Sequence, residues 1–378
     1  MDETIIQVRT LLHRMIYCIL FVLLASFAVL DLVKDADWPK TWVFGVSVVS
    51  LVFISGIRWD TGPDWQSYFD FYRDIVLYAK GPWRAANFME PGYTSLNLLI
   101  HGLGFSYTGF LIVLAVITIG LKAGVFYRHR DIMVICLFLY FCYYLGDIAS
   151  VRQFTAVSIT LLATMFIINR KPLWFVLLVL VACSIHISSV LFLGAYWIYY
   201  RPHSRTLLFL VLIFAFILGI THVADYVVSL GAKLLSGSSD VAAKLMTYQK
   251  QGVESTPNYY FSFLLGTLKR IIVLPLFILA INFIKEKYKS RYTGYLNLLV
   301  FGNAVYFLFA LSIPVIQRLS VPFLIFEIFL WGYLLVSISD IKLRYASYLL
   351  VVLFGAFRLY SFISPYKEFY IPFKTIFG

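Results

Sequence analysis

The chain alternates between long apolar stretches and short polar loops along almost its whole length. Apolar runs of about 17 to 25 residues can cross a hydrocarbon core of roughly 30 Å as helices. The pattern predicts about twelve such spans, which we place near 15–33, 41–57, 107–127, 131–148, 152–169, 172–186, 188–200, 205–228, 259–283, 292–312, 318–338 and 345–363. The sequence therefore predicts an all-α, polytopic transmembrane helical bundle in which residues 1–378 form a single integral membrane domain.

Composition strengthens this interpretation. Of the 378 residues, 61% are hydrophobic and 13% are charged, whereas the apolar fraction of an ordinary soluble domain is nearer one half. The first run, 15–33, lacks a small-residue cleavage site and is followed by another apolar run. We therefore interpret it as a retained span and not as a signal peptide.

The formal net charge of +12 comes from basic residues that are dispersed in short loops. A nucleic-acid-binding protein would gather them in a stripe, so this class is disfavoured. The positive-inside rule instead predicts that the basic loops are cytoplasmic, and they lie at 128–130, 170–171, 201–205, 285–291 and 342–344. The opposite, external side then receives 146–152, the region around His186, 229–258, 313–318 and the tail from 364.

The short apolar segment 92–104 leaves the topology of the N-terminal region open. If it crosses the membrane, the polar residues that precede it are cytoplasmic, as the basic residues ahead of the first span also suggest. If it is a re-entrant or interfacial helix, they are external. The breakers Pro91-Gly92 and Gly102-Leu103-Gly104 at its two ends favour the second arrangement. We expect 58–104 to be an external loop with interfacial or re-entrant helices.

The stretch 229–258 is the longest loop that is expected to be external. Gly237-Ser238-Ser239 is typical of a hinge and helix start, and the apolar residues after it recur at the spacing of a short amphipathic helix. This loop is either a simple interfacial connection or a lid over a lipid-linked substrate.

The densest polar group follows the second span. Arg58, Asp60, Asp64 and Tyr68 occur within eleven residues, and Glu90 follows them. Asp60 and Asp64 flank a Thr-Gly-Pro turn that can aim both carboxylates at one volume. A glycosyl acceptor hydroxyl needs such a carboxylate as a base or an orienting group. We predict that Asp60, Asp64 and Glu90 are catalytic; the alternative is an interfacial turn held by an Arg–Asp pair.

Further candidates lie at the external ends of later spans. Arg152 and Gln153 open one span, and His186 closes the next approach to the same side. A histidine there suits a base or a donor to a phosphate oxygen, and the alternative is a structural histidine. The tail around Tyr366 either closes over the same cavity or belongs to an interfacial Tyr/Lys belt.

Three arginines occur within or at the start of later apolar runs, namely Arg270, Arg318 and Arg358. Charges at such depth are costly, and several cations around one cavity suit a pyrophosphate group. Snorkelling to the interface is the alternative for each of them. No His/Cys metal constellation and no phosphate-cradling Gly-rich loop occurs in the sequence, so we predict neither a metal site nor a cofactor.

These motifs, taken in order, resemble a known family. The landmarks Arg58…Gly62…Asp64…Tyr68, Glu90-x-Gly92-Tyr93, Arg152-Gln153 with Ala156, and Ala182-x-x-x-His186-x-Ser188 look like those of EpsG-like, Wzy-type polysaccharide polymerases. The resemblance covers about residues 50 to 190. The C-terminal half is similar in hydropathy and in its basic external residues.

The resemblance implies an O-antigen or exopolysaccharide polymerase of the bacterial inner membrane, with a layout similar to GT-C glycosyltransferases. Such an enzyme acts at the periplasmic face and moves a growing glycan from undecaprenyl diphosphate onto a lipid-linked repeat unit. A flippase and a chain-length regulator of the same pathway are its implied partners. Arg58, Tyr68, Arg152, Gln153, Arg270, Arg318, Arg358 and Tyr366 are then expected to bind the substrate or its diphosphate.

Three other functions fit parts of the sequence. An O-antigen ligase would use the same cavity chemistry to transfer finished glycan to a lipid A core. A non-enzymatic flippase for lipid-linked oligosaccharides predicts inverted repeats and charges across the whole membrane depth, whereas here most of the charged candidate residues gather on one side and no repeat is found. A membrane O-acyltransferase would use His186 as its catalytic residue.

Overall fold

The computed structural model describes residues 3–33, 36–80, 89–149, 152–223, 226, 259–311 and 314–377. These residues form helices and one isolated β-bridge. The chain divides into two compact units, with Met1–Ile187 and Trp331–Gly378 in unit 1 and Ser188–Leu330 in unit 2. The expected lid at 229–258 lies outside the described residues.

Unit 1 contains most of the motifs that the sequence singles out. Its helices are α1 (Glu3–Ala28), η1 (Val29–Asp31), α2 (Asp37–Gly56), α3 (Trp65–Arg73), α4 (Ile75–Lys80), α5 (Pro91–Gly102), α6 (Tyr107–Tyr127), α7 (Met133–Tyr143), α8 (Gly146–Ala149), α9 (Arg152–Ile168), α10 (Pro172–Ile185), α20 (Ile341–Ile363), η6 (Ser364–Tyr366) and α21 (Lys367–Tyr370). Two helices continue past the boundary between the units, η3 (Ile187–Gly194) and α19 (Phe326–Ser337).

Unit 2 is built mainly from three long helices. They are α12 (Arg205–Ile220), α15 (Tyr259–Ala280) and α16 (Glu286–Phe309). Shorter elements complete it, namely α11 (Ala195–Tyr200), η4 (Ile281–Phe283), α17 (Pro314–Gln317), η5 (Arg318–Ser320) and α18 (Val321–Leu324). The side-chain amide of Asn297 in α16 donates to the carbonyls of Ile198 and Arg201 at 3.3 and 2.8 Å, which joins α16 to the end of α11.

Five helices of the described residues are long and apolar enough to cross a membrane: Asp37–Gly56, Tyr107–Tyr127, Phe263–Phe283, Arg318–Ser337 and Ile341–Tyr370. Six shorter apolar helices have 10–17 residues. Phe53, Ile272 and Leu350 are 58%, 69% and 66% exposed, as suits surfaces that face lipid. The prediction of an all-α membrane protein is confirmed; the length criterion supports five spans and not the full count of twelve.

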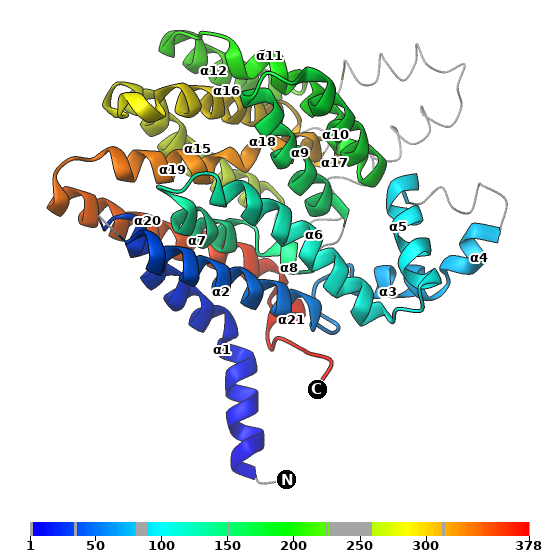
Figure 1. Cartoon of the computed structure of the whole chain (residues 1–378). Coiled ribbons are helices and arrows are strands. Elements are labelled where there is room, and N and C mark those ends of the chain that lie inside the picture. The colour runs from blue at the N-terminus through cyan, green and yellow to red at the C-terminus, as the bar shows by residue number, and fades with distance from the viewer. Residues whose placement is uncertain are drawn as a thin grey trace, which may run out of the picture. The chain divides into compact units, whose positions relative to one another are not determined.

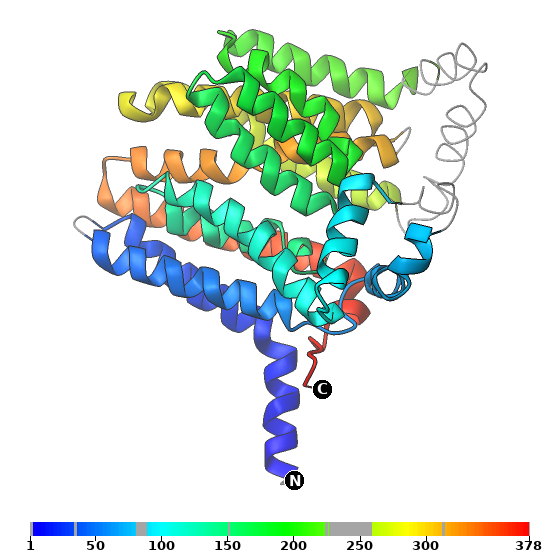
Figure 2. The same ribbon diagram turned by 45° about the vertical axis from the view of Figure 1, so that its right-hand side comes forward.

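Helices α2 and α6 run antiparallel. At one end, Arg130 just after α6 donates to Thr41 Oγ1 near the start of α2 at 3.3 Å. At the other end, Gly56 lies against Ile112, where a Cβ atom would come within 2.6 Å of Cγ1. The segment 57–106 therefore leaves and returns at the same end, and α5 does not run along the pair. Figures 1 and 2 show α3 and α5 grouped at that end of α6. We call it the motif end.

The opposite end of unit 1 carries basic loops. Asp31 Oδ2 accepts the backbone N–H groups of Val134 and Ile135 at 2.7 and 2.8 Å, which caps the start of α7. Arg344, near the start of α20, donates to Leu32 O at 3.4 Å. The loops that precede α7 and α20 thus lie together, away from the motif end. These basic loops and the motif residues therefore lie at opposite ends of unit 1.

Helix α7 forms the centre of unit 1, and every one of its residues is buried. It is apolar all round, which is the pattern of a helix that is enclosed by other helices. Its neighbours include α1, through the Phe21 and Phe138 rings at 5.4 Å, and α20, where Gly355 lets Cys142 approach closely. This enclosed helix explains how an 11-residue element can belong to a membrane domain without facing lipid.

Candidate active site

The motif end of unit 1 brings together polar side chains that are distant in sequence. Arg152, the first residue of α9, lies with Nη1 2.6 Å from Glu90 Oε2 and donates from Nε to Tyr68 OH at 3.3 Å. The other carboxylate oxygen, Glu90 Oε1, accepts the backbone N–H of Ile187 at 3.2 Å. About one fifth of each charged side chain is exposed, so the ion pair is reachable and yet largely shielded from water.

A close backbone approach makes this convergence possible. Glu90 is the N-cap of α5, and Pro91 follows it at a position where the missing N–H costs nothing. The next residue, Gly92, packs against the end of α10, where a Cβ atom would lie 2.2 Å from Ser184 Oγ. Because only glycine fits there, the start of α5 can lie against the end of α10.

His186 is the C-cap of α10 and leaves the helix in an extended conformation. It directly precedes Ile187, whose backbone N–H donates a hydrogen bond to Glu90, and its side chain is half-buried. The structure therefore gathers Tyr68, Glu90 and Arg152 at one place, and the backbone of His186 leads directly into the Ile187 amide that donates to Glu90. Gln153, next to Arg152 in α9, is also half-buried.

Aromatic packing holds α3 and α5 around this group. Tyr68, Tyr72 and Tyr93 belong to one buried cluster with the start of α6. The Arg152 guanidinium carbon lies 5.8 Å from the Tyr68 ring centre and 5.9 Å from that of Tyr93, within the range of cation–π attraction. Trp65, which the sequence places next to the paired aspartates, is buried and stacked on Phe69 at 5.0 Å.

Arg58 has a different setting from Arg152. It is 3% exposed, and its Nη1 donates to Ser55 O at 2.7 Å and to Ser55 Oγ at 3.2 Å, in the last turn of α2. A cation at this position is favoured by the helix dipole. Burial lowers the pKa of Arg58, and the nearby Tyr107 and Tyr370 oppose this shift. Arg58 thus fixes the end of α2 where the motif begins.

The C-terminal tail pairs with the same stretch. Arg58 and Thr375 form an antiparallel bridge, in which Trp59 N–H donates to Lys374 O at 2.9 Å and Ile376 N–H donates to Ile57 O at 3.0 Å. A further bond from Gly62 N–H reaches Phe369 O at 3.1 Å. The tail therefore acts as a strap across the start of the motif.

The two aspartates of the motif lie on its surface. Asp60 adopts a left-handed conformation with φ of 45° and forms an ion pair with Lys374 of the tail. Asp64 is the N-cap residue of α3, and its side chain is exposed. Glu90 is accordingly the carboxylate that the structure places on Arg152.

The remaining candidate residues are spread over both units. In unit 1, Arg358 of α20 lies over the Tyr143 ring at 4.3 Å, and Tyr366 is 44% exposed in η6. In unit 2, Arg318 is exposed at the start of η5.

Arg270 is a cation of unit 2 that several contacts hold in place. Its Nε donates to Asn303 Oδ1 at 2.7 Å, its Nη1 donates to Gly266 O at 2.9 Å, and its guanidinium stacks on Tyr306 at 3.4 Å from the ring centre. These contacts fix the plane of the guanidinium. A cavity of about 260 Å³ beside it is lined mainly by apolar side chains of α12, α15 and α16. Arg270 thus presents a guanidinium in a fixed orientation beside a mainly apolar cavity.

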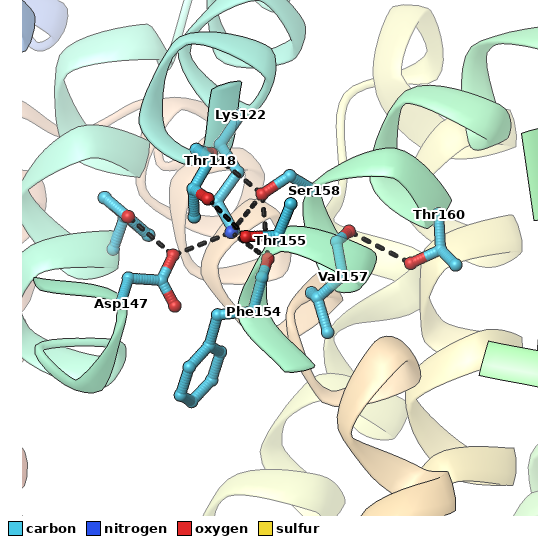
Figure 3. A network of polar contacts seen from close by, with 9 residues as sticks. Thr118, Lys122, Asp147, Phe154, Thr155, Val157, Ser158 and Thr160 are labelled. Carbon is cyan, nitrogen blue, oxygen red and sulfur yellow. Dashed lines mark hydrogen bonds and ion pairs between the residues drawn. The ribbon is translucent and has the colours of Figure 1, made fainter. Parts of the chain in front are cut away.

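The sequence analysis missed a buried network beneath the motif end. Lys122 of α6 and Asp147 of α8 form an ion pair at 2.7 Å, and both side chains are fully buried (Figure 3). Tyr140 OH donates to the same carboxylate oxygen at 2.6 Å. A lysine inside an otherwise apolar run is the signal that could have revealed it, because a charge there needs a partner.

Among the residues that the structure describes, no group of three or more His, Cys, Asp or Glu side chains is placed to hold a metal ion. The groups at the motif end offer a carboxylate, a guanidinium, a phenol and an imidazole. Such a set can bind a phosphate group and accept a proton.

The fold and this site define an all-α membrane protein with a polar site at one end of an apolar helical unit. A comparison with family models matches the EpsG family over residues 41–375. The chain belongs to the EpsG family, which supports a role in polysaccharide biosynthesis of the polymerase type. No curated protein and no solved structure matches the chain.

Proposed function

We propose that the protein is a polysaccharide polymerase, a glycosyltransferase that moves a growing glycan from undecaprenyl diphosphate onto a lipid-linked repeat unit. The observation that supports this most directly is the gathering of Arg152, Glu90 and Tyr68 from three separate segments, with His186 next in sequence to the Ile187 amide that Glu90 accepts. A phosphate-binding cation thus lies beside groups that can accept a proton, as glycosyl transfer from a diphosphate carrier requires.

In the proposed reaction the anomeric C–O bond to the diphosphate breaks, and the bonding electron pair leaves with the diphosphate. A new C–O bond forms to the acceptor hydroxyl, whose proton passes to Glu90 or His186. Arg152 stabilises charge on the departing diphosphate. The diphosphate is itself an activated leaving group, so the chain needs no nucleotide-binding motif.

Unit 2 supplies a second feature that suits a lipid diphosphate. The Arg270 guanidinium is held in place beside an apolar cavity that is lined by residues such as Phe209, Leu274 and Phe307. A cation next to an apolar wall matches a ligand with an anionic head and an isoprenoid chain. We propose that Arg270 and Arg318 of unit 2 bind the diphosphate head of a lipid-linked substrate.

We further propose that the chain crosses the bacterial inner membrane twelve times with the motif end in the periplasm, where a flippase and a chain-length regulator act beside it. The five long spans, the six shorter apolar helices and α16 correspond to the twelve apolar runs of the sequence. An Asp64→Cys variant tests the orientation, because an impermeant thiol reagent added to the periplasm should label it. Protection from that reagent would place the motif in the cytoplasm.

The function is tested by the glycan ladder of a deletion strain that is complemented with wild type, Arg152→Ala or His186→Ala. Wild type should restore long chains, and both variants should leave single repeat units at normal membrane levels. Arg73→Ala is the matched control, since Arg73 also pairs with carboxylates at this end but is 56% exposed. Full ladders from both variants would contradict the proposed roles. Free lipid-linked polymer with uncapped lipid A core in the deletion strain would indicate a ligase instead.

The role of Arg270 is tested in the same strain. Arg270→Ala should abolish long chains, whereas Lys289→Ala should not, because Lys289 pairs with Glu286 on the exposed surface of α16. Equal ladders from the two variants would remove Arg270 from the proposed site.

A further inference from the structure

The ammonium of Lys122 uses all three of its N–H donors inside unit 1. It lies 2.7 Å from Asp147 Oδ2 and donates to Phe154 O at 2.9 Å and to Ser158 Oγ at 2.5 Å. Figure 3 shows the ammonium between the carboxylate on one side and the start of α9 on the other. No part of either charged side chain is exposed.

Such a pair is an expensive way to join helices. Desolvating two charges costs free energy that their attraction returns only when the geometry is good, and apolar side chains of similar volume often pack equally well. Neighbouring polar contacts extend the network: Ser158 Oγ can donate to Thr118 O at 2.8 Å or to Phe154 O at 2.9 Å, and Thr118 and Thr155 join their hydroxyls at 2.7 Å. A network of this kind fixes one arrangement of the helices.

The contacts of Lys122 lie on two successive helices, α8 and α9. Asp147 belongs to α8, whereas Phe154 and Ser158 belong to the first turns of α9. Arg152 opens α9, two residues before the carbonyl that Lys122 binds. The ammonium therefore ties down the helix start from which the Arg152 side chain reaches Glu90 and Tyr68.

We propose that Lys122 and Asp147 are positioning residues that hold Arg152 in place for the transfer reaction. This inference rests on the proposed function for its catalytic meaning, but its geometric content can be tested separately. None of the hydrogen bonds and ion pairs described for Lys122 and Asp147 reaches Tyr68, Glu90 or Arg152. They act by fixing the start of α9, and a displacement of about 1 Å at such a distance can lower a rate by about 100-fold.

The test uses a double variant, Lys122→Met with Asp147→Asn, which removes both charges together and so avoids a lone buried charge. At wild-type membrane levels, its glycan ladder should fall by about 10- to 100-fold in long chains. The matched control is Tyr333→Phe, which removes the buried 2.6 Å hydrogen bond to His129 at the opposite end of unit 1. This control should retain the wild-type ladder.

A second readout reports position and not activity. In a background without the four native cysteines, Tyr68→Cys and Arg152→Cys are cross-linked with a short bifunctional maleimide. The cross-linking rate should fall when the Lys122→Met and Asp147→Asn changes are added and should stay unchanged with Tyr333→Phe. An unchanged rate together with a full ladder would overturn the proposal.

Two further outcomes keep the test decisive. If wild type itself restores no polymer, the proposed function fails, and the cross-linking rate still decides whether Lys122 positions α9. If the double variant does not accumulate, Ser158→Ala serves instead, because it removes one acceptor of the ammonium and leaves the ion pair intact. A partial loss of long chains supports the proposal, and a wild-type ladder overturns it.

Discussion

The guanidinium of Arg152 lies 2.6 Å from the carboxylate of Glu90, although 62 residues separate the two along the chain. The pair is completed by Tyr68 on one side and by the Ile187 amide on the other. A charge pair that is four-fifths buried, with a neutral acceptor on its arginine and a neutral donor on its carboxylate, is more ordered than a surface salt bridge. This relationship organises the candidate site and leads to the predictions below.

Arg152→Lys should fold normally and polymerise poorly. A lysine keeps the charge but lacks the planar fork that serves Glu90 and Tyr68 together. We expect a reduction of long chains by about 100-fold, the usual scale for removing an electrostatic catalytic group. The glycan ladder, scaled to protein level, measures the effect. A ladder equal to that of wild type would show that charge alone suffices.

Gly92→Ala should displace the start of α5. The added Cβ would lie 2.2 Å from Ser184 Oγ and 2.7 Å from Ser184 O, so backbone must move. Overpacking of this kind costs about 1–3 kcal/mol, and the shift should also separate Glu90 from Arg152. Thermal unfolding in detergent and the glycan ladder report the two effects.

Gly102→Ala is the matched control at the other end of the same helix. A Cβ there meets no atom within 4 Å, so the change should be neutral or slightly stabilising. Equal behaviour of the two glycine variants would contradict the close approach of α5 to α10.

The tail strap should depend on its backbone bonds more than on its ion pair. Ile376→Pro removes the N–H that Ile57 O accepts at 3.0 Å, which should cost about 1–3 kcal/mol. Lys374→Ala should cost at most about 1 kcal/mol, because the pair with Asp60 is half-exposed. Limited proteolysis of the tail ranks the two variants, and a greater effect of Lys374→Ala would refute this order.

Tyr306 should stabilise unit 2 through its ring and not through its hydroxyl. The Arg270 guanidinium lies 3.4 Å from the ring centre, and a desolvated cation–π contact contributes about 2 kcal/mol. Tyr306→Leu should therefore lower the melting temperature and the yield of long chains, whereas Tyr306→Phe should retain both. Similar losses in both variants would assign the effect to the hydroxyl.

Several features of the fold could be predicted because they depend on local sequence. The run 107–127 coincides with α6, and the run 152–169 begins at the first residue of α9. The breakers around 92–104 predicted a short separate element, and α5 runs from Pro91 to Gly102 before α6 starts at Tyr107. The length of an apolar run and the helix-breaking residues at its ends act locally, so the position of a helix can be predicted from its own segment of sequence.

The individual roles within the polar group depended on packing. The sequence ranked Asp60 and Asp64 with Glu90, yet the structure sets Asp60 against Lys374 and sets Glu90 against Arg152. Arg58 belonged to the same motif, and its guanidinium donates a hydrogen bond to the last turn of α2. These partners come from distant segments, and no spacing within the motif encodes them.

The sequence by itself determined the class of protein, the apolar segments and the separation of basic loops from motif residues, since burial in lipid and the positive-inside rule act on each segment alone. Only the tertiary structure decided that Glu90 pairs with Arg152 and that Lys122 pairs with Asp147. A partly desolvated charge must find a partner in three dimensions, and which partner it finds depends on how the helices pack.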